Sequence, residues 1–306
     1  MKVLFAAPSR DWDEWHAALL AACPEMELLR DGDPQEFDAL VYAPGYPEDG
    51  STLDFSAFTN ARLVQSLWAG VERIVTNKTL TQPLCRMVDP GLEQGMVEYC
   101  TGWAMRAHLR MDELAQDGVW RNEVVPPLAA DRKVTVLGMG ELGRAVAQNL
   151  RGLGFDVAGW SRSGTPVQGI TVFGGDALSS ALRRADILIC LLPSTPETQN
   201  LLDRDTLALL PNGATIINAG RGSLIDDAAL LDALPTGHPQ HAILDVFRTE
   251  PLPPDHPFWH HPQVTVTPHV AAATRPASAA KIAAGNLRRA MRGDDLLYLV
   301  DRERGY

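Results

Sequence analysis

Three residues of complementary chemistry, Arg221, Glu250 and His269, each follow a short apolar run in the second half of the chain. Such runs predict buried parallel strands, and ligands of open parallel sheets bind at the carboxyl ends of strands. An imidazole can exchange a proton with a hydroxyl group while a carboxylate orients the ring. A guanidinium can hold a substrate carboxylate and polarise a carbonyl oxygen. Together the three side chains suit hydride transfer, coupled to proton transfer, on a hydroxy acid.

A glycine-rich stretch at residues 133–143, KVTVLGMGELG, predicts a strand, a tight turn and a helix. Gly138, Gly140 and Gly143 form the pattern G-x-G-x-x-G, in which the glycines permit the turn, the approach of a pyrophosphate and helix–strand packing. The N-terminus of the following helix offers N–H groups and partial positive charge to phosphates. Because a strand precedes the motif and a helix follows it, we predict a dinucleotide site. This site also takes in Met139, Glu141 and Leu142.

The adenosine end of this site predicts NADPH in preference to NADH. The second strand, residues 156–160, is followed by Ser161, Arg162 and Ser163 rather than by an acid that would bind a ribose 2′-hydroxyl. Arg162 can form charge-assisted hydrogen bonds to a 2′-phosphate, and the serine hydroxyls can donate to its other oxygens. A second interpretation stays open, in which Arg162 stacks on adenine and both cofactors are accepted.

Composition limits the class of protein. At 306 residues the chain exceeds what one core usually supports, so two domains are expected. A formal net charge of -11 argues against nucleic acid or an anionic membrane as a partner. No apolar run is long enough to span a bilayer, and the run at residues 3–7 is shorter than a signal-peptide core. These features predict a cytoplasmic enzyme.

Cysteine and histidine spacing predicts neither disulfides nor a metal site. The four cysteines show no C-x-x-C spacing and lie in apolar runs, so we expect buried free thiols. His256, His260 and His261 have no acidic or cysteine partner at ligand spacing, so a solvated loop is the favoured interpretation.

Strands alternate with helices along the chain, which predicts an α/β protein with two doubly wound parallel sheets. The first turn reads Ala-Ala-Pro-Ser without the glycine pattern, and Pro8 has no N–H for a phosphate. We therefore expect a smaller, flavodoxin-like substrate domain at residues 1–97 with 274–306. A Rossmann dinucleotide-binding domain at 98–273 is inserted into it. Strands of the first domain are predicted at residues 2–8, 26–29, 39–42, 62–68 and 86–88.

A long helix is predicted at residues 95–116, with apolar side chains around most of its circumference. Such a helix must be covered, either by the other domain or by a second subunit, and we expect a homodimer. In the following loop, Trp120 has two open interpretations, a packed loop aromatic or a residue that reaches the partner's active site.

Five segments, GMGELG, LLPSTPET, NAGRG, DVFRTEPLP and TPHVAA, resemble the D-2-hydroxyacid dehydrogenase family in order and spacing. The resemblance covers nearly the whole chain and implies a catalytic triad of Arg221, Glu250 and His269. Taken singly, these residues would fit a surface charge, a loop acid and a loop histidine. The resemblance also implies a dimer built through the nucleotide-binding domains. The implied cofactor residues outside the glycine turn are Leu192, Pro193, Thr198, Ala219, Gly220 and Asp245, the last at the nicotinamide carboxamide.

For the substrate, the resemblance implies that backbone N–H groups of Ala69, Gly70 and Val71 hold its carboxylate. The local sequence, Trp-Ala-Gly-Val-Glu, departs from the Gly-Ala-Gly-Val-Asp of many relatives, which changes the expected shape of the pocket. Arg275 either caps the final helix or adds a second cation to the substrate carboxylate.

The segments WSRS, TPETQNLL, EPLPPDHPFW and PHVAAATRP resemble more closely those family members that reduce glyoxylate and hydroxypyruvate. This implies NADPH-dependent reduction of small 2-oxo acids to glycolate or D-glycerate, with His269 as the proton donor. Two alternatives stay open: a dehydrogenase of the same family for another 2-hydroxy acid, and a corepressor-like protein that senses a nucleotide.

Overall fold

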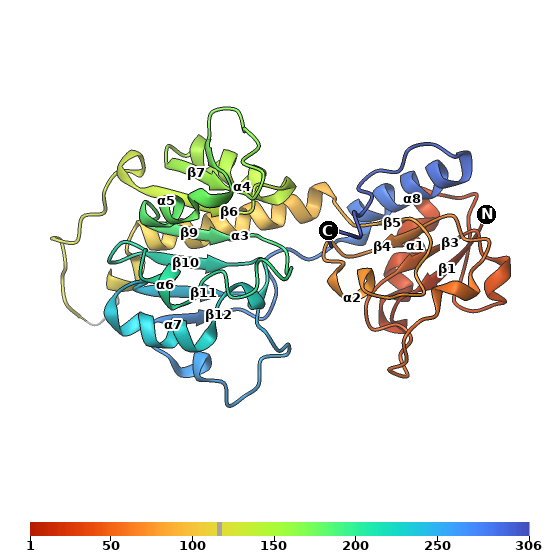
Figure 1. The fold of residues 1–306 in the computed structure, drawn as a ribbon, viewed down its shortest axis with the longest axis horizontal. Helices are drawn as coiled ribbons and strands as arrows, with labels where there is room; N and C mark the ends of the chain where they lie inside the picture. Colours follow the sequence, from red (N-terminus) through yellow and green to blue (C-terminus); the bar gives the residue numbers. More distant parts are fainter. Residues whose placement is uncertain (115–117, 306) are drawn as a thin grey trace. The chain divides into compact units, whose positions relative to one another are not determined.

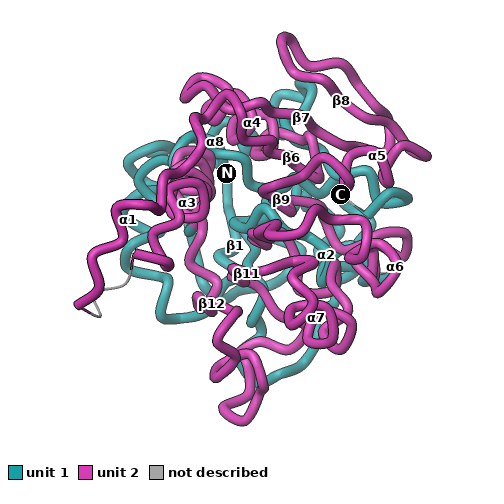
Figure 2. The backbone as a smooth tube through the Cα atoms, turned by 90° about the vertical axis from the view of Figure 1, so that its left-hand side faces the viewer, with its two compact units in different colours: residues 1–92, 273–306 teal, residues 93–272 magenta. Residues whose placement is uncertain are grey.

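The computed structural model describes residues 1–114 and 118–305. The chain forms two compact units (Figures 1 and 2), with one boundary inside a long helix. Unit 1 consists of Met1–Leu92 and Ala273–Tyr306, and unit 2 of Glu93–Ala272. Both are α/β structures built on a parallel sheet, which confirms the predicted fold class.

The sheet of unit 1 has the strand order β2-β1-β3-β4-β5, which is the flavodoxin-like order. Helices α1 and α8 cover one face of this sheet. Trp15 and Leu19 of α1 lie in the same apolar core as Leu287 of α8. The strands are β1 (Lys2–Ala6), β2 (Glu27–Leu29), β3 (Ala39–Tyr42), β4 (Val64–Ser66) and β5 (Leu84–Cys85). The helices are α1 (Trp12–Ala22), α2 (Glu72–Val75) and α8 (Pro276–Arg292).

The fifth strand of this sheet lies at Leu84–Cys85, so the prediction of a strand at residues 86–88 was wrong. Beyond Cys85 the regular ladder with β4 ends, although the N–H of Met87 still donates to the carbonyl of Trp68. On the other edge of this segment, the N–H of Arg86 donates to the carbonyl of Tyr298 in the C-terminal segment. The C-terminal segment is distant in the sequence, so a local pattern could not reveal this contact.

The sheet of unit 2 has the order β12-β11-β10-β9-β6-β7-β8, a Rossmann arrangement with its switch point between β6 and β9. Helices α3 and α4 cover one face, and α5, α6 and α7 cover the other (Figure 1). The strands are β6 (Lys133–Leu137), β7 (Asp156–Trp160), β8 (Thr171–Phe173), β9 (Ile187–Cys190), β10 (Thr215–Asn218), β11 (His241–Leu244) and β12 (Val264–Val266). The helices are α3 (Pro90–His108), α4 (Glu141–Gly152), α5 (Leu178–Arg183), α6 (Arg204–Leu207) and α7 (Asp227–Ala233).

Helix α3 corrects the prediction of a helix at residues 95–116. It begins with Pro90, which suits a first helical turn because its missing N–H has no helical partner there. It ends before Arg110, whose φ of 53° is left-handed, and a 3₁₀ turn, Met111–Leu114, follows. The rest of the predicted helix lies outside the described residues. Buried side chains recur every fourth residue, at Met96, Cys100 and Ala104, so one face packs on the sheet of unit 2.

Candidate active site

Glu250 and His269 form a hydrogen-bonded pair in unit 2. The Nδ1 atom of His269 lies 2.7 Å from Oε2 of Glu250, and the other carboxylate oxygen accepts from the N–H of Phe247 at 2.9 Å. The carboxylate is therefore fixed on both sides, and it fixes the ring. Because Nδ1 faces Glu250, Nε2 is the ring atom left to exchange a proton with a substrate.

His269 adopts a left-handed backbone conformation, with φ of 54°. This conformation is unfavourable for a residue with a Cβ and persists only where the surroundings hold it. Here the N–H of His269 donates to the carbonyls of Asp245 at 2.9 Å and of Thr267 at 3.1 Å. The bend turns the imidazole out of line with β12 and toward Glu250.

The loop that carries His269 is anchored by the fully buried carboxylate of Asp245. Its Oδ1 accepts from the hydroxyl of Thr267 at 2.6 Å and from the N–H of Val270 at 2.9 Å, and its Oδ2 accepts from the N–H of Ala271 at 2.9 Å. The hydroxyl of Tyr99 on α3 lies 2.7 Å from that of Thr267 and must donate to it. Burial raises the pKa of Tyr99, so it stays a neutral donor. Both oxygens of Asp245 therefore hold the backbone at 267–271, and its contact with a nicotinamide carboxamide stays a prediction.

Arg221 lies in the loop after β10, which pairs with β11, the strand that leads to Glu250. The side chain of Asn218 shapes this loop: its amide donates to the carbonyl of Arg221 at 3.0 Å and its oxygen accepts from the N–H of Gly220 at 3.2 Å. The guanidinium of Arg221 donates to the carbonyl of Gly220 at 2.6 Å. β11 pairs in turn with β12, so the three predicted residues follow adjacent strands.

The glycine turn after β6 has the geometry of a phosphate cradle. A Cβ atom at Gly143 would lie 1.7 Å from the carbonyl oxygen of Gly138, and one at Gly138 would lie 2.7 Å from that of Leu191. Gly138 also has φ of 104°. A Cβ atom at Gly140, the N-cap of α4, would meet nothing within 4 Å. Because the first N–H groups of α4 have no helical partner, this open space suits an anion.

The other predicted cofactor residues surround this turn. Met139 packs on β7, where a Cβ at Gly159 would meet its sulfur, and Glu141 and Leu142 open α4. The carbonyl of Pro193 accepts from the hydroxyl of Thr198 at 2.7 Å, which closes the loop after β9. A Cβ at Gly220 would lie 3.0 Å from the carbonyl of Leu192, so the loops after β9 and β10 are in contact. Leu192 and Ala219 are buried.

At the end of β7, Ser161 has a buried hydroxyl oxygen that finds no hydrogen-bond partner among the described residues. Ser163 lies in the same exposed turn, its hydroxyl 2.7 Å from that of Thr165. A buried polar atom without a partner is costly, so this atom fits a site that a ligand completes. The side chain of Glu197, which the sequence did not indicate, lies near Arg162. Its own backbone N–H and Thr195 lower the pKa of Glu197, and the charge of Arg162 adds to the effect.

The residues predicted to bind substrate through unit 1 lie at two element ends. Ala69, Gly70 and Val71 link β4 to α2, with Val71 buried and at the N-cap of α2. Arg275 is the N-cap of α8, but its side chain makes no capping hydrogen bond, and its carbonyl accepts from the N–H groups of Ser278 and Ala279. Arg275 therefore caps α8 by its position and its backbone carbonyl and not by its side chain, and the role toward a substrate carboxylate stays a prediction.

Within residues 1–114 and 118–305, no three His, Cys, Asp or Glu side chains gather in a way that could hold a metal ion. In the same described ranges, no helix combines the length and the apolar character needed to cross a bilayer. All four cysteines are free and buried, as predicted.

A phosphate cradle at the switch point and an imidazole–carboxylate pair on nearby strand ends define a nucleotide-dependent dehydrogenase. Residues 103–271 match the family described as D-isomer specific 2-hydroxyacid dehydrogenase, NAD binding domain. The chain belongs to the D-isomer specific 2-hydroxyacid dehydrogenases, as its motifs indicated, and is thus an enzyme of the oxidoreductase class.

Solved structures agree with this assignment over the whole chain. A D-isomer specific 2-hydroxyacid dehydrogenase from Xanthobacter autotrophicus Py2, in complex with NADPH and MES, is 37% identical with a TM-score of 0.90. An NADPH-dependent glyoxylate/hydroxypyruvate reductase from Sinorhizobium meliloti, in complex with NADP and sulfate, is 34% identical with a TM-score of 0.88. A probable 2-hydroxyacid dehydrogenase from Rhizobium etli CFN 42, in complex with NADP, HEPES and L(+)-tartaric acid, is 27% identical with a TM-score of 0.88. Each match covers 100% of this chain and 99% of the other.

Proposed function

We propose that this enzyme uses NADPH to reduce small 2-oxo acids, glyoxylate and hydroxypyruvate, to glycolate and D-glycerate. The observation that carries the proposal is the 2.7 Å hydrogen bond between His269 and Glu250, in a chain whose relatives include an NADPH-dependent glyoxylate/hydroxypyruvate reductase. When bound, the nicotinamide supplies a hydride to the carbonyl carbon.

The residues of this chain supply the rest of the chemistry. Nε2 of His269 gives its proton to the carbonyl oxygen as the hydride arrives, and Glu250 stabilises the imidazolium before transfer. Arg221 binds the substrate carboxylate and polarises the carbonyl, so it acts on both binding and the transition state. The N–H groups of Ala69, Gly70 and Val71, and the guanidinium of Arg275, are proposed to complete the binding of the carboxylate.

Several features support NADPH. The hydroxyl oxygen of Ser161 is buried and has no hydrogen-bond partner within the described part of the chain. This oxygen, the cation of Arg162 and the hydroxyl of Ser163 can all serve a 2′-phosphate. Three related structures contain NADPH or NADP. The carboxylate of Glu197 opposes the phosphate, so the preference is expected to be moderate.

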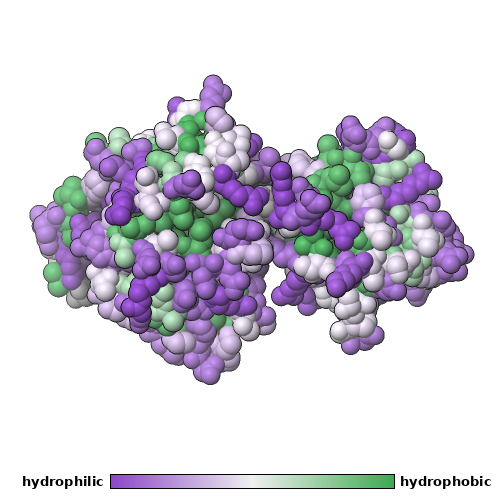
Figure 3. Space-filling model, in the orientation of Figure 1, coloured by the Kyte–Doolittle hydropathy of each residue, from purple (hydrophilic) through white to green (hydrophobic). Residues whose placement is uncertain are grey.

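We also propose a homodimer built through unit 2. Trp120 is 87% exposed, so it is not a packed loop aromatic in the single chain. Val119, Val125 and Leu128 are also exposed, and hydrophobic residues reach the surface in this part of unit 2 (Figure 3). A second copy that covers this segment would bring Trp120 toward the partner's unit.

A substrate panel tests the proposed function. The absorbance of the reduced nicotinamide is followed with NADPH and with NADH, against glyoxylate, hydroxypyruvate, pyruvate and larger 2-oxo acids. We expect the highest kcat/KM for the two small acids with NADPH. Preference for a larger acid would indicate another dehydrogenase of the family, and tight NADPH binding without any turnover would favour a nucleotide sensor.

A further inference from the structure

The loop that carries Arg221 and the loop that carries Glu250 are in direct backbone contact. At Gly222, directly after Arg221, a Cβ atom would lie 2.0 Å from the carbonyl carbon of Phe247 and 2.4 Å from the nitrogen of Arg248. No side chain fits in this space, so a glycine is required for the approach. The relative position of the two loops therefore decides where Arg221 lies with respect to Glu250.

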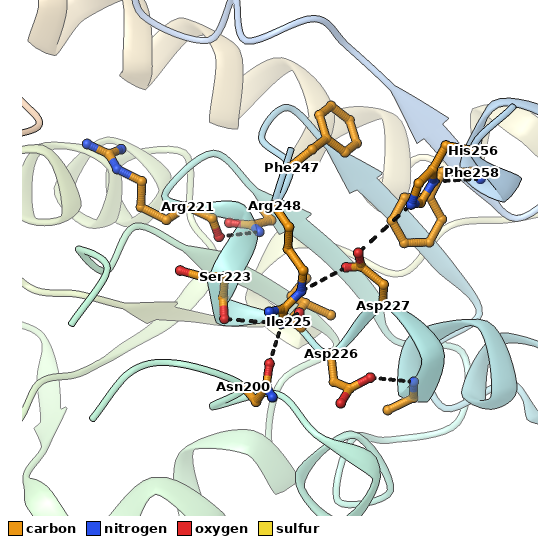
Figure 4. Close-up of polar contacts among 12 residues, drawn as sticks. Asn200, Arg221, Ser223, Ile225, Asp226, Asp227, Phe247, Arg248, His256 and Phe258 are labelled. Carbon is orange, nitrogen blue, oxygen red and sulfur yellow. Dashed lines mark hydrogen bonds and ion pairs between the residues drawn. The ribbon is translucent and has the colours of Figure 1, made fainter. Parts of the chain in front are cut away.

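The side chain of Arg248 spans this contact (Figure 4). From the Glu250 loop, its Nη2 donates to the carbonyl of Ile225 and lies 3.4 Å from that of Ser223, both on the Arg221 loop. The same nitrogen donates to the side-chain oxygen of Asn200, and Nε lies 3.6 Å from Oδ1 of Asp227 at the start of α7. Only 31% of the surface of the Arg248 side chain is exposed.

The side chains of Arg248 and Arg221 extend in different directions (Figure 4). In Figure 4 the guanidinium of Arg221 extends away from the group around Arg248. One residue before Arg248, the N–H of Phe247 donates to Glu250 at 2.9 Å, so a shift of Arg248 would move the carboxylate that orients His269. A guanidinium has five donors in a rigid plane, which is what bonding several acceptors on separate segments requires.

We propose that Arg248 is a positioning residue that locks the Arg221 loop to the Glu250 loop and so sets the geometry of all three catalytic residues. The inference rests on the proposed function, because it assigns Arg221 and the Glu250–His269 pair to one reaction. Arg248 itself pairs with Asp227 and is not proposed to contact the substrate.

The test begins with Arg248→Met, which keeps much of the apolar part of the side chain and removes the guanidinium. We expect kcat/KM for the 2-oxo acid to fall about 10- to 100-fold, since small misplacements of catalytic groups have effects of this size. The NADPH dissociation constant should stay within about twofold, because no proposed cofactor residue is changed. Arg248→Lys should recover only part of the loss, because an ammonium cannot reproduce the planar fork.

A double variant separates positioning from stability. Burial raises the pKa of Asp227, and the charges of Arg248 and His256 oppose that rise. Arg248→Met therefore leaves a partly buried acid with only His256, whose Nε2 lies 3.9 Å from Oδ2, beside it. Adding Asp227→Asn removes this penalty. If Arg248 is a positioning residue, the double variant regains thermal stability but not kcat/KM. If Arg248 is merely structural, activity returns with stability, and the proposal is overturned. Arg204→Met is the matched control, because Arg204 pairs with Asp232 on the surface of the same unit with 76% of its side chain exposed.

Amide hydrogen exchange gives a readout that does not need turnover. Arg248→Met should speed exchange in residues 222–226 and 247–250 and leave the glycine turn at 138–143 unchanged. Should the wild type turn over no 2-oxo acid, the proposed function fails, and exchange alone decides the role of Arg248. Unchanged exchange in both loops, or kcat/KM within about twofold of an active wild type, would overturn the proposal.

Discussion

Asp245→Asn offers the sharpest structural test of how His269 is held. The carboxylate of Asp245 is fully buried and accepts three hydrogen bonds, from Thr267, Val270 and Ala271. An asparagine keeps one oxygen, so an NH₂ group must face at least one of these donors. Losing a hydrogen bond to a charged group costs about 1.5–3 kcal/mol, and a buried donor left without a partner adds about 1–3 kcal/mol.

Together these effects predict a loss of about 2.5–6 kcal/mol in the free energy of unfolding, a large share of the roughly 5–15 kcal/mol typical of a native protein. Because the same bonds hold the residues on both sides of His269, kcat should also fall about 100-fold. Urea unfolding and steady-state kinetics measure the two effects. Asp232→Asn is the control, since Asp232 is 65% exposed. A loss below about 1 kcal/mol with unchanged kcat would refute the reasoning.

Three further predictions concern the cofactor and the dimer. Gly140→Ala should abolish NADPH binding in calorimetry without lowering stability, because its Cβ would meet no atom of the described residues within 4 Å. Gly143→Ala should lower both binding and stability, and retained binding in Gly140→Ala would contradict the phosphate cradle. Arg162→Ala should raise KM for NADPH about tenfold and leave KM for NADH nearly unchanged. Glu197→Gln should lower KM for NADPH. Equal effects of Arg162→Ala on both cofactors would exclude a 2′-phosphate site. Light scattering should give twice the 33.3 kDa of one chain for the wild type and a shift toward monomer for Trp120→Ser; a wild-type monomer at micromolar concentration would disprove the dimer.

The sequence predicted most of what local patterns control. The glycine turn after β6, the loops that carry Arg221, Glu250 and His269, and the parallel alternation all follow from short-range periodicity and turn chemistry. The start of α3 at Pro90 and its end before Arg110 were missed, because apolar spacing outweighed the signals of proline and a left-handed residue.

What could not be predicted depends on contacts between distant segments. The carbonyl of Tyr298 in the C-terminal segment accepts from the N–H of Arg86 just after β5. Glu197 comes near Arg162 only when the strands flanking β6 are assembled. The hydrogen bonds of Arg248 to Ser223 and Ile225 likewise require loops from several strands to meet. The burial of Asp245 is of the same kind, since its partners come from the loop after the next strand.

The central claim is that His269, oriented by Glu250, donates the proton in an NADPH-dependent reduction. The most direct measurement is single-turnover reduction of glyoxylate by wild type and His269→Gln at saturating NADPH, with cofactor binding measured on both. The account predicts that the variant binds NADPH within about twofold of wild type and reduces glyoxylate about 10²- to 10⁴-fold more slowly. Reduction by His269→Gln at close to the wild-type rate would contradict it.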